Sequence, residues 1–165
     1  MPDRPLFTST AVVKPEWIDY NGHMNMAYYH LVFDQGVDFA YDKIGIGADY
    51  LAQGGSCFTR EVHVHYLSEL ALGEPIQVTW QLLDWDAKRL HFFERMYRGS
   101  QNPENPEDNL VATSEQMALH VDMGTRRTAP FPEFIQSKLE AMMADHQQLE
   151  RPPQVGTLMQ IRRSS

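Results

Sequence analysis

Apolar side chains recur at intervals of three and four residues over one long stretch of the chain. The series consists of Met26, Tyr29, Phe33, Val37, Ala40, Tyr41 and Ile44. This spacing places them on one face of an α-helix, and Gly45 directly after the series favours a helix end. Another stripe of this helix carries His30, Asp34 and Asp38, which is typical of a solvated or interface surface; a ligand-facing Asp34 is the alternative. We therefore expect a long helix that buries one face against a second layer of structure.

Beyond Cys57 apolar and polar side chains alternate, which is the period of β-strands. The predicted strands, with an earlier one that Pro15 closes, span residues 6–13, 61–67, 76–82, 88–98 and 110–121. Residues 99–108 are polar and contain two prolines, and we expect a hairpin loop there. A shorter helix is predicted from Phe131 to Met143, followed by an irregular tail from Arg151. This order predicts an α+β fold with a long central helix on an antiparallel sheet.

Length and composition narrow the class of protein. The 165 residues suffice for one domain, residues 1–165, with a core over about 6–146. Acidic residues outnumber basic ones by 22 to 14, which argues against a nucleic-acid-binding surface. The single cysteine, Cys57, excludes an intramolecular disulfide and favours a reducing cytoplasm; we expect it to be a buried structural residue. Residues 1–5 lack a signal-peptide core, and no run approaches the roughly 18–20 apolar residues of a spanning helix. We expect a cytoplasmic protein that does not enter the membrane.

The segment Trp17-Ile18-Asp19-Tyr20-Asn21-Gly22-His23-Met24-Asn25 runs directly into the predicted helix. It carries a carboxylate, two carboxamides and an imidazole at alternate positions, and in an extended chain these side chains project to one side. Asn25 is suited to cap the helix, whose positive end and free N–H groups would face whatever Asp19 acts upon. Gly22 would let the backbone pass close to a substrate. Asp, Asn and Gly are also ordinary turn residues, so a plain loop is the alternative interpretation.

The run from Asp19 to Asn25, with Tyr28 and Tyr29 after it, resembles the Asp-x-Asn-x-His-x-Asn signature of hotdog-fold acyl-thioester thioesterases. In that group the aspartate, asparagine and histidine belong to the active site, together with a later glutamate in a Tyr-x-x-Glu context. Tyr66-Leu67-Ser68-Glu69 has this context, so the resemblance implies a site role for Glu69. Residues 17–25, 83–91 and 112–122 are more closely similar to the thioesterases of bacterial carnitine breakdown, which are associated with betainyl-CoA. The resemblance implies a hotdog fold over most of residues 6–130 and hydrolysis of a short acyl-CoA thioester, with betainyl-CoA as the leading substrate.

Thioester hydrolysis needs an activated water or a nucleophile, and donors for the oxygen that becomes negative. Asp19 can act as a general base or as a nucleophile, and the sequence does not separate these roles. Asn21 would position water or substrate, Asn25 completes the polar set, and His23 could orient Asp19 or move a proton. The backbone N–H groups of Gly22, His23 and Met24 are the predicted oxyanion donors. No Gly-x-Ser-x-Gly motif occurs, which disfavours a serine nucleophile.

Binding residues are harder to assign from the sequence. Cations suited to the phosphates of CoA are Arg60, Lys88, Arg89, Arg126 and Arg127. Aromatic rings suited to a quaternary ammonium group are Tyr20, Tyr28, Trp80 and Trp85. His63 and His65 share one face of a strand, but two histidines at this spacing favour a polar sheet face over a metal site. We expect no metal and no cofactor, since CoA is part of the substrate.

A single helix on a curved sheet leaves an edge and a face uncovered, so we expect a homodimer or homotetramer with sites between subunits. Two other functions stay open on the sequence alone. One is a hydratase or dehydratase of the same fold, which would use the same Asp and His types. The other is a module that binds acyl-CoA without catalysis, because fold alone does not decide function.

Overall fold

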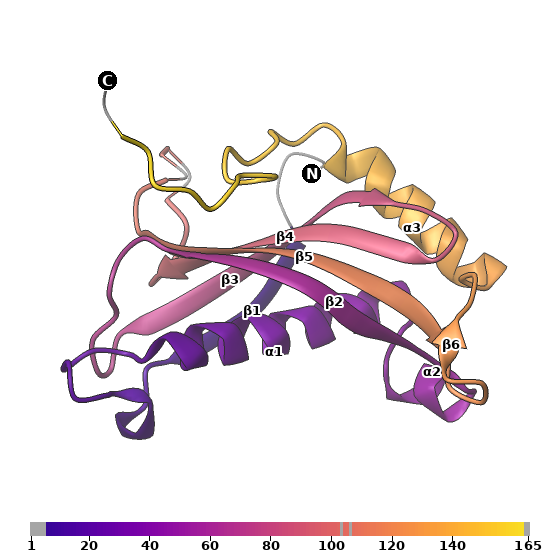
Figure 1. Ribbon diagram of the computed structural model, residues 1–165, viewed down its shortest axis with the longest axis horizontal. Helices are drawn as coiled ribbons and strands as arrows, with labels where there is room; N and C mark the ends of the chain where they lie inside the picture. The colour runs from indigo at the N-terminus through magenta and orange to yellow at the C-terminus, as the bar shows by residue number, and fades with distance from the viewer. Residues whose placement is uncertain (1–5, 103, 106, 164–165) are drawn as a thin grey trace.

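The computed structural model describes residues 6–102, 104–105 and 107–163. Within these residues six strands form one antiparallel sheet, and the long helix α1 (Met26–Ile44) lies along one face of it (Figure 1). The strands are β1 (Leu6–Val12), β2 (Gly55–Tyr66), β3 (Pro75–Trp85), β4 (Arg89–Arg98), β5 (Leu110–Asp122) and β6 (Arg127–Thr128). Their order is β1-β3-β4-β5-β2, and β6 pairs with the end of β5. The predicted α+β arrangement is confirmed.

Helix α1 has the bounds that the apolar spacing predicts. Its first turn is capped by Asn25, whose side-chain oxygen accepts the Ala27 N–H at 3.0 Å. At the other end Gly45 adopts a left-handed conformation with φ of 87°, which a residue with a Cβ would adopt only with strain. Val32, Phe33, Ala40 and Ile44 lie against the sheet and are fully buried.

The face of the sheet under α1 carries the core in two apolar clusters. Phe92 of β4 belongs to the cluster at the C-terminal end of α1, and Met96 belongs to the cluster at its N-terminal end. Glu94 lies between them on the same face of β4 and is completely buried. Its Oε2 accepts a hydrogen bond of 2.9 Å from Gln116, which also donates to Ser114 at 3.1 Å. Burial raises the pKa of the Glu94 carboxyl well above its usual range, so the buried acid favours its neutral form.

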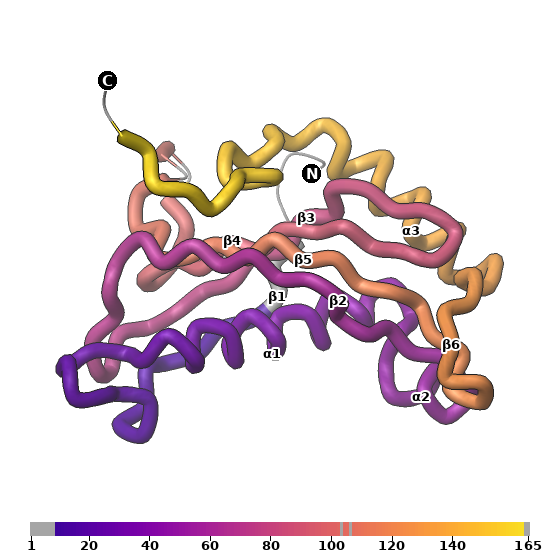
Figure 2. The backbone as a smooth tube through the Cα atoms, in the orientation of Figure 1, coloured from indigo at the N-terminus to yellow at the C-terminus, as the bar shows by residue number. Residues whose placement is uncertain are grey.

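The C-terminal part of the chain covers a strand edge and the other face of the sheet. Among the described residues, strand β1 pairs with β3 only as far as Trp80, and helix α3 (Glu133–His146) lies along the rest of that edge. There the Leu82 N–H, which has no described strand partner on this side, donates to His146 Nδ1 at 2.9 Å. The tail then crosses the face opposite α1 (Figure 2), where Gly156 N–H donates to Glu115 at 2.8 Å. As predicted, the tail has no regular secondary structure over residues 151–163.

Four features differ from the sequence prediction. Strand β2 begins at Gly55, two residues before the strand-like run predicted from Cys57 and six before the clear alternation at Glu61, because its first half is partly exposed and its alternation is weak. The short helix α2 (Ala48–Ala52) was not predicted, since five residues are too few to show a helical period. A 3-10 turn at Pro15–Trp17 and the two-residue β6 were missed for the same reason. In the predicted 99–108 loop, positions 103 and 106 lie outside the described residues.

Among the residues that the structure describes, no helix is both long enough and apolar enough to cross a lipid bilayer.

Candidate active site

The segment before α1 is a tight turn and not the extended strand that the sequence prediction assumed. Gly22 N–H donates to the Asp19 carbonyl at 3.0 Å, and Asp19 N–H donates to the His23 carbonyl at 3.2 Å. Gly22 has a φ of 83°, so it is needed for the left-handed turn; a Cβ there would meet no protein atom within 4 Å. The turn reverses the chain and returns Asn25 to Asp19. Of the four side chains expected to converge, the turn brings Asn25 to the Asp19 carboxylate, whereas the Asn21 side chain is exposed and the His23 ring lies toward Glu69.

Both oxygens of the Asp19 carboxylate are held by donors from this turn. Oδ1 accepts the Asn21 backbone N–H at 2.8 Å, and Oδ2 accepts Asn25 Nδ2 at 2.9 Å. These two hydrogen bonds, the Asn21 one first, lower the pKa of the Asp19 carboxyl, so it is ionised at neutral pH. Asn25 thus joins the acid to the helix cap, while the Asn21 side chain is exposed.

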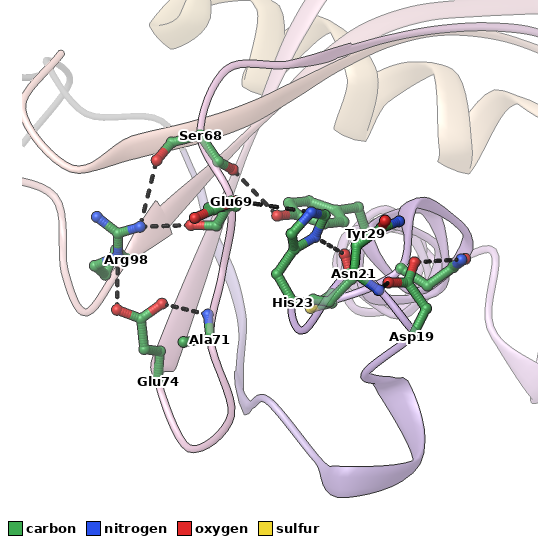
Figure 3. Close-up of polar contacts among 11 residues, drawn as sticks. Asp19, Asn21, His23, Tyr29, Ser68, Glu69, Ala71, Glu74 and Arg98 are labelled. Atoms are coloured by element: carbon green, nitrogen blue, oxygen red, sulfur yellow. Dashed lines mark hydrogen bonds and ion pairs between the residues drawn. The ribbon is translucent and has the colours of Figure 1, made fainter.

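His23 faces the loop that follows β2. Its Nδ1 lies 3.2 Å from the Met24 carbonyl oxygen, to which an Nδ1–H can donate, and its Nε2 lies 3.6 Å from Glu69 Oε2. Figure 3 shows the His23 ring between Asp19 and Glu69, turned toward the glutamate. Glu69, which was predicted from its Tyr-x-x-Glu context and lies more than 40 positions beyond His23 in the chain, therefore comes close to the histidine ring. A ring held at Nδ1 leaves Nε2 as the atom that can exchange a proton.

A cavity of about 340 Å³ opens beside this pair. Its lining consists of His23, Met24, Met26, Tyr29, Tyr66, Leu67, Ser68 and Glu69. Tyr29 donates its hydroxyl to the Ser68 carbonyl at 3.1 Å, and Tyr66 donates to the Met26 carbonyl at 3.2 Å. Asp19 and Asn21 lie beside the cavity and not in its wall. Sequence reasoning took Tyr29 for a core residue and missed Ser68; the Tyr-x-x-Glu context was the one signal that pointed to this loop.

Two of the three predicted oxyanion donors are already bonded in this structure. Gly22 N–H donates to Asp19 as described above, and Met24 N–H donates to the Leu70 carbonyl at 2.8 Å. Among the described residues the His23 N–H has no acceptor. It is therefore the member of the predicted set that remains available to a substrate oxygen.

Arg98, at the end of β4, holds the loop that carries Ser68 and Glu69 (Figure 3). Its Nη2 donates to the Glu69 carbonyl at 2.6 Å and to Ser68 Oγ at 3.3 Å. Its Nε forms an ion pair of 2.9 Å with Glu74, which accepts the Ala71 N–H at 2.7 Å. No sequence signal indicated Arg98, because a basic residue at a strand end is commonplace.

The predicted aromatic binding residues do not gather at the cavity. Tyr20 is 98% exposed at the tip of the turn, and Tyr28 stacks on Trp17 with ring centroids 5.6 Å apart. Trp80 is fully buried and Trp85 packs against the same apolar cluster, so both belong to the core.

The predicted phosphate-binding residues gather elsewhere. Arg60, Lys88 and Arg89 line a separate cavity of about 670 Å³ with Met117, on the sheet face opposite α1. Arg89 is paired with Asp86, its Nε lying 2.7 Å from the carboxylate. Arg126 lies over the Phe58 ring and Arg127 lies in β6.

The remaining candidate residues have structural partners. The rings of His63 and His65 have centroids 4.4 Å apart and planes tilted by 52°, and His65 Nε2 lies 3.3 Å from Thr157 Oγ1 of the tail. Cys57 is a free, partly buried thiol packed against the core, and burial raises its pKa to about 12. A thiol that stays protonated at neutral pH is a poor nucleophile. The predicted structural role of Cys57 fits this environment.

Comparison with known proteins identifies the family. The model of the thioesterase-like superfamily matches residues 13–139. The chain belongs to this superfamily. A Pseudomonas aeruginosa protein named betainyl-CoA thioesterase is 37% identical over 155 residues, which are 93% of this chain and 94% of that protein. A Rhizobium protein named L-carnitine dehydrogenase/betainyl-CoA thioesterase is 37% identical over 161 residues, 98% of this chain. The chain spans only 31% of that longer protein.

Solved structures agree on the fold of this thioesterase-like protein. A Staphylococcus aureus protein solved in complex with CoA superposes with a TM-score of 0.85 and 32% identity, covering 97% of this chain and 98% of that chain. A structure described as a putative thioesterase from Pseudomonas putida gives a TM-score of 0.81 and 32% identity, covering 97% and 99%. The predicted hotdog fold and the predicted thioester hydrolase class are confirmed.

Proposed function

We propose that this protein hydrolyses betainyl-CoA to glycine betaine and CoA. The observation that carries the proposal is the match to the Pseudomonas aeruginosa betainyl-CoA thioesterase over nearly the whole of both chains. The site geometry supports the proposal, because an ionised carboxylate, a histidine and the His23 backbone N–H, which has no acceptor among the described residues, lie at the start of a helix.

In the proposed reaction Asp19 accepts a proton from water as the water oxygen bonds to the thioester carbonyl carbon. The His23 N–H and the positive end of α1 stabilise the carbonyl oxygen as it becomes negative. The C–S bond then breaks, and the proton that Asp19 took from water passes by way of His23 Nε2, beside Glu69, to the leaving thiolate of CoA, which returns both side chains to their starting protonation states. In the nucleophilic variant Asp19 itself bonds to the carbonyl carbon, and water cleaves the resulting anhydride. Incorporation of ¹⁸O into Asp19 during a single turnover in H₂¹⁸O would identify the anhydride route, since the general-base route places the label only in the product.

We also propose that two copies pair through the open edge of β2. Within the described residues β2 pairs only with β5, and its 12 residues leave a long row of backbone groups on the other side. Arg60 and Glu61 stand at the centre of the strand. Antiparallel pairing of two copies about this centre would place Arg60 of each opposite Glu61 of the other, which favours that register.

The activity is tested by release of free CoA thiol from betainyl-CoA, acetyl-CoA, a medium-chain acyl-CoA and an aromatic acyl-CoA. We expect betainyl-CoA to have the highest kcat/KM. Loss of enoyl absorbance from an unsaturated acyl-CoA without thiol release would instead indicate a hydratase. Absence of thiol release from every member would contradict the proposed function.

The pairing is tested by light scattering after size exclusion. The wild-type protein should have at least twice the mass of one chain. Arg60→Glu should weaken self-association, and the double variant Arg60→Glu, Glu61→Arg should restore it, because the opposite charges again face each other. A wild-type protein with the mass of a single chain would contradict the pairing.

A further inference from the structure

A second cavity, of about 440 Å³, lies between α1 and the first half of β2. Its polar lining includes Asp34, Asp38, Tyr41, Asp42, Cys57 and Thr59. Neither the proposed reaction nor the proposed pairing uses this cavity.

The cavity carries negative charge without a balancing cation. Asp34, Asp38 and Asp42 project from successive turns of α1, and no lysine or arginine is among the described residues that line the space. None of the three carboxylates makes a hydrogen bond or an ion pair with a described residue. Burial, and then the charge of Asp34, raises the pKa of the Asp38 carboxyl.

Tyr41 is an independent observation that bears on this cavity. Its side chain is only 8% exposed, and its hydroxyl has no hydrogen-bond partner among the described residues. Of the ionisable groups close enough to act on this hydroxyl, Cys57, Asp38 and Asp34 all line the cavity, and Glu94 lies in the sheet behind it. Tyr41 itself is among the residues that line the cavity. Since nearly all buried polar groups in proteins are paired, this one is expected to meet a ligand or water there.

We propose that this cavity binds the quaternary ammonium group of the acyl chain, an inference that rests on the function proposed above. A trimethylammonium group has no N–H to donate, so it is recognised by negative charge and by aromatic surface. Asp34 and Asp38 supply the charge, and Tyr41 supplies the aromatic surface. The sequence left a ligand-facing Asp34 open as the alternative to a solvated or interface surface, and the proposal adopts this alternative for Asp34 and for Asp38 one turn away.

The ammonium cavity of one chain is too far from the catalytic end of the same chain to bind the thioester that is cleaved there. Asp34 and Asp38 lie eight and twelve residues beyond Met26, which is roughly 12 to 18 Å along the helix. In a betainyl group only one methylene separates the ammonium from the carbonyl carbon. The ammonium cavity must therefore act with the catalytic end of another chain.

Pairing through β2 would bring the ammonium cavity of one copy and the catalytic cavity of the other together. The Tyr66 end of β2 contacts the start of α1, and the Cys57 end lies beside Tyr41 near its other end. A two-fold axis perpendicular to the sheet reverses both elements in the second copy. The Cys57 end of one β2 then lies beside the Tyr66 end of the other, so each ammonium cavity adjoins the catalytic cavity of the second copy.

The first test compares betainyl-CoA with its neutral carbon isostere, 3,3-dimethylbutyryl-CoA. The two acyl groups have the same shape and differ only in the charge of the branched atom. In Asp34→Asn and Asp38→Asn we expect the ratio of the two kcat/KM values to fall at least tenfold. The matched control Glu140→Gln, on the exposed side of α3, should leave the ratio unchanged. A ratio unaltered in both aspartate variants would overturn the proposal.

The second test asks whether the cavity acts across the pair. Asp19→Asn and the double variant Asp34→Asn, Asp38→Asn are co-expressed with different tags, and the mixed pair is purified through both. If the cavity serves the second copy, each site combines the catalytic end of one chain with the ammonium cavity of the other. In the mixed pair one site then carries all the substitutions, and the other site carries none. About half of the wild-type betainyl-CoA rate should return. A mixed pair no more active than its parents would show that both halves belong to one chain, against the proposal.

A binding measurement separates this inference from the proposed function. If the wild type hydrolyses neither ester, the proposed function fails, and calorimetry with glycine betaine and its isostere 3,3-dimethylbutanoate decides on the cavity. Tighter binding of glycine betaine that is lost in the double aspartate variant would support the ammonium site. Equal binding of the two ligands would overturn it.

Discussion

Asp19 holds its position through donors from its own turn, and this determines how a substitution there should act. Asn at position 19 has nearly the same shape and can still accept the Asn21 N–H, but it carries no negative charge. We expect Asp19→Asn to lower kcat by roughly 10² to 10⁴, the range for loss of a general base, with little change in thermal stability. Thiol release from betainyl-CoA measures this. An active Asp19→Asn variant would exclude the acid from the reaction.

The buried Glu94 should make stability depend on pH. In the unfolded chain it ionises near its usual pKa of 4.5, whereas burial raises the folded pKa. The native state then binds the extra proton, so its stability is full below pH 4.5 and declines as the pH rises toward the folded pKa. Glu94→Gln cannot ionise, and its stability relative to wild type should increase from pH 4 to pH 8.

Each unit of pKa shift in Glu94 corresponds to about 1.4 kcal/mol in that comparison. Urea unfolding of Glu94→Gln and wild type at both pH values measures it. The exposed control Glu140→Gln should show no such trend. A difference between Glu94→Gln and wild type that does not change with pH would mean that the buried acid is ionised in the native state.

Among the structural elements, the loop between β2 and β3 depends on Arg98 for its shape. The arginine binds the backbone of Glu69 and the acid of Glu74, and the loop in turn bonds Tyr29 and Met24. We expect Arg98→Ala to lower kcat about tenfold, because Glu69 would no longer stand opposite His23. Arg98→Lys should restore part of the rate, since a lysine keeps the charge but not the forked geometry.

The Arg98 variants are compared by kcat, KM and thermal unfolding. Arg151→Ala, which removes an exposed arginine of the tail, is the control. A kcat that stays at the wild-type value while the melting temperature falls would show that Arg98 supports the fold and not the site.

Helix α2 rests on the first residue of β2. A Cβ at Gly55 would collide with the ring of Tyr50, whose hydroxyl lies 2.6 Å from His120 Nε2. We expect Gly55→Ala to destabilise the protein by roughly 1–3 kcal/mol, the usual range for overpacking. Chemical unfolding measures this. Gly124→Ala is the matched control, because a Cβ there would meet only the Asp122 side chain, at 3.2 Å. Equal stability of the two variants would mean that α2 shifts to accommodate the added Cβ without a loss of stability.

At the scale of the whole molecule, the tail from residue 151 closes one face of the sheet. Pro152 is buried, and Gly156 and Thr157 are bonded to Glu115 and His65. Removing residues 151–165 should leave a folded protein that unfolds roughly 3–10 °C lower, equivalent to roughly 1–3 kcal/mol at this chain length. Thermal unfolding monitored by circular dichroism measures this. An unchanged melting temperature would mean that the tail merely lies on the surface.

The helix and the main strands could be predicted because each repeats its own period many times along the chain. The site could be predicted only in part. The contact between Asp19 and Asn25 was expected, but from an extended chain, since the alternation of residue types does not reveal a turn that needs the positive φ of Gly22. The hydrogen bond from Arg98 to the Glu69 carbonyl joins residues 29 positions apart, and a local sequence pattern carries no signal for such a contact.

Helix α1 separates two tasks along its length. Its capped start holds the acid, whereas Asp34 and Asp38 project from its exposed side and support neither the cap nor the core. Substitutions there should cost little stability, because exposed helix positions tolerate change. During evolution, single substitutions on this surface could therefore change which acyl group the enzyme prefers, while the catalytic residues stay the same. In a symmetric pair each such change would alter both sites at once.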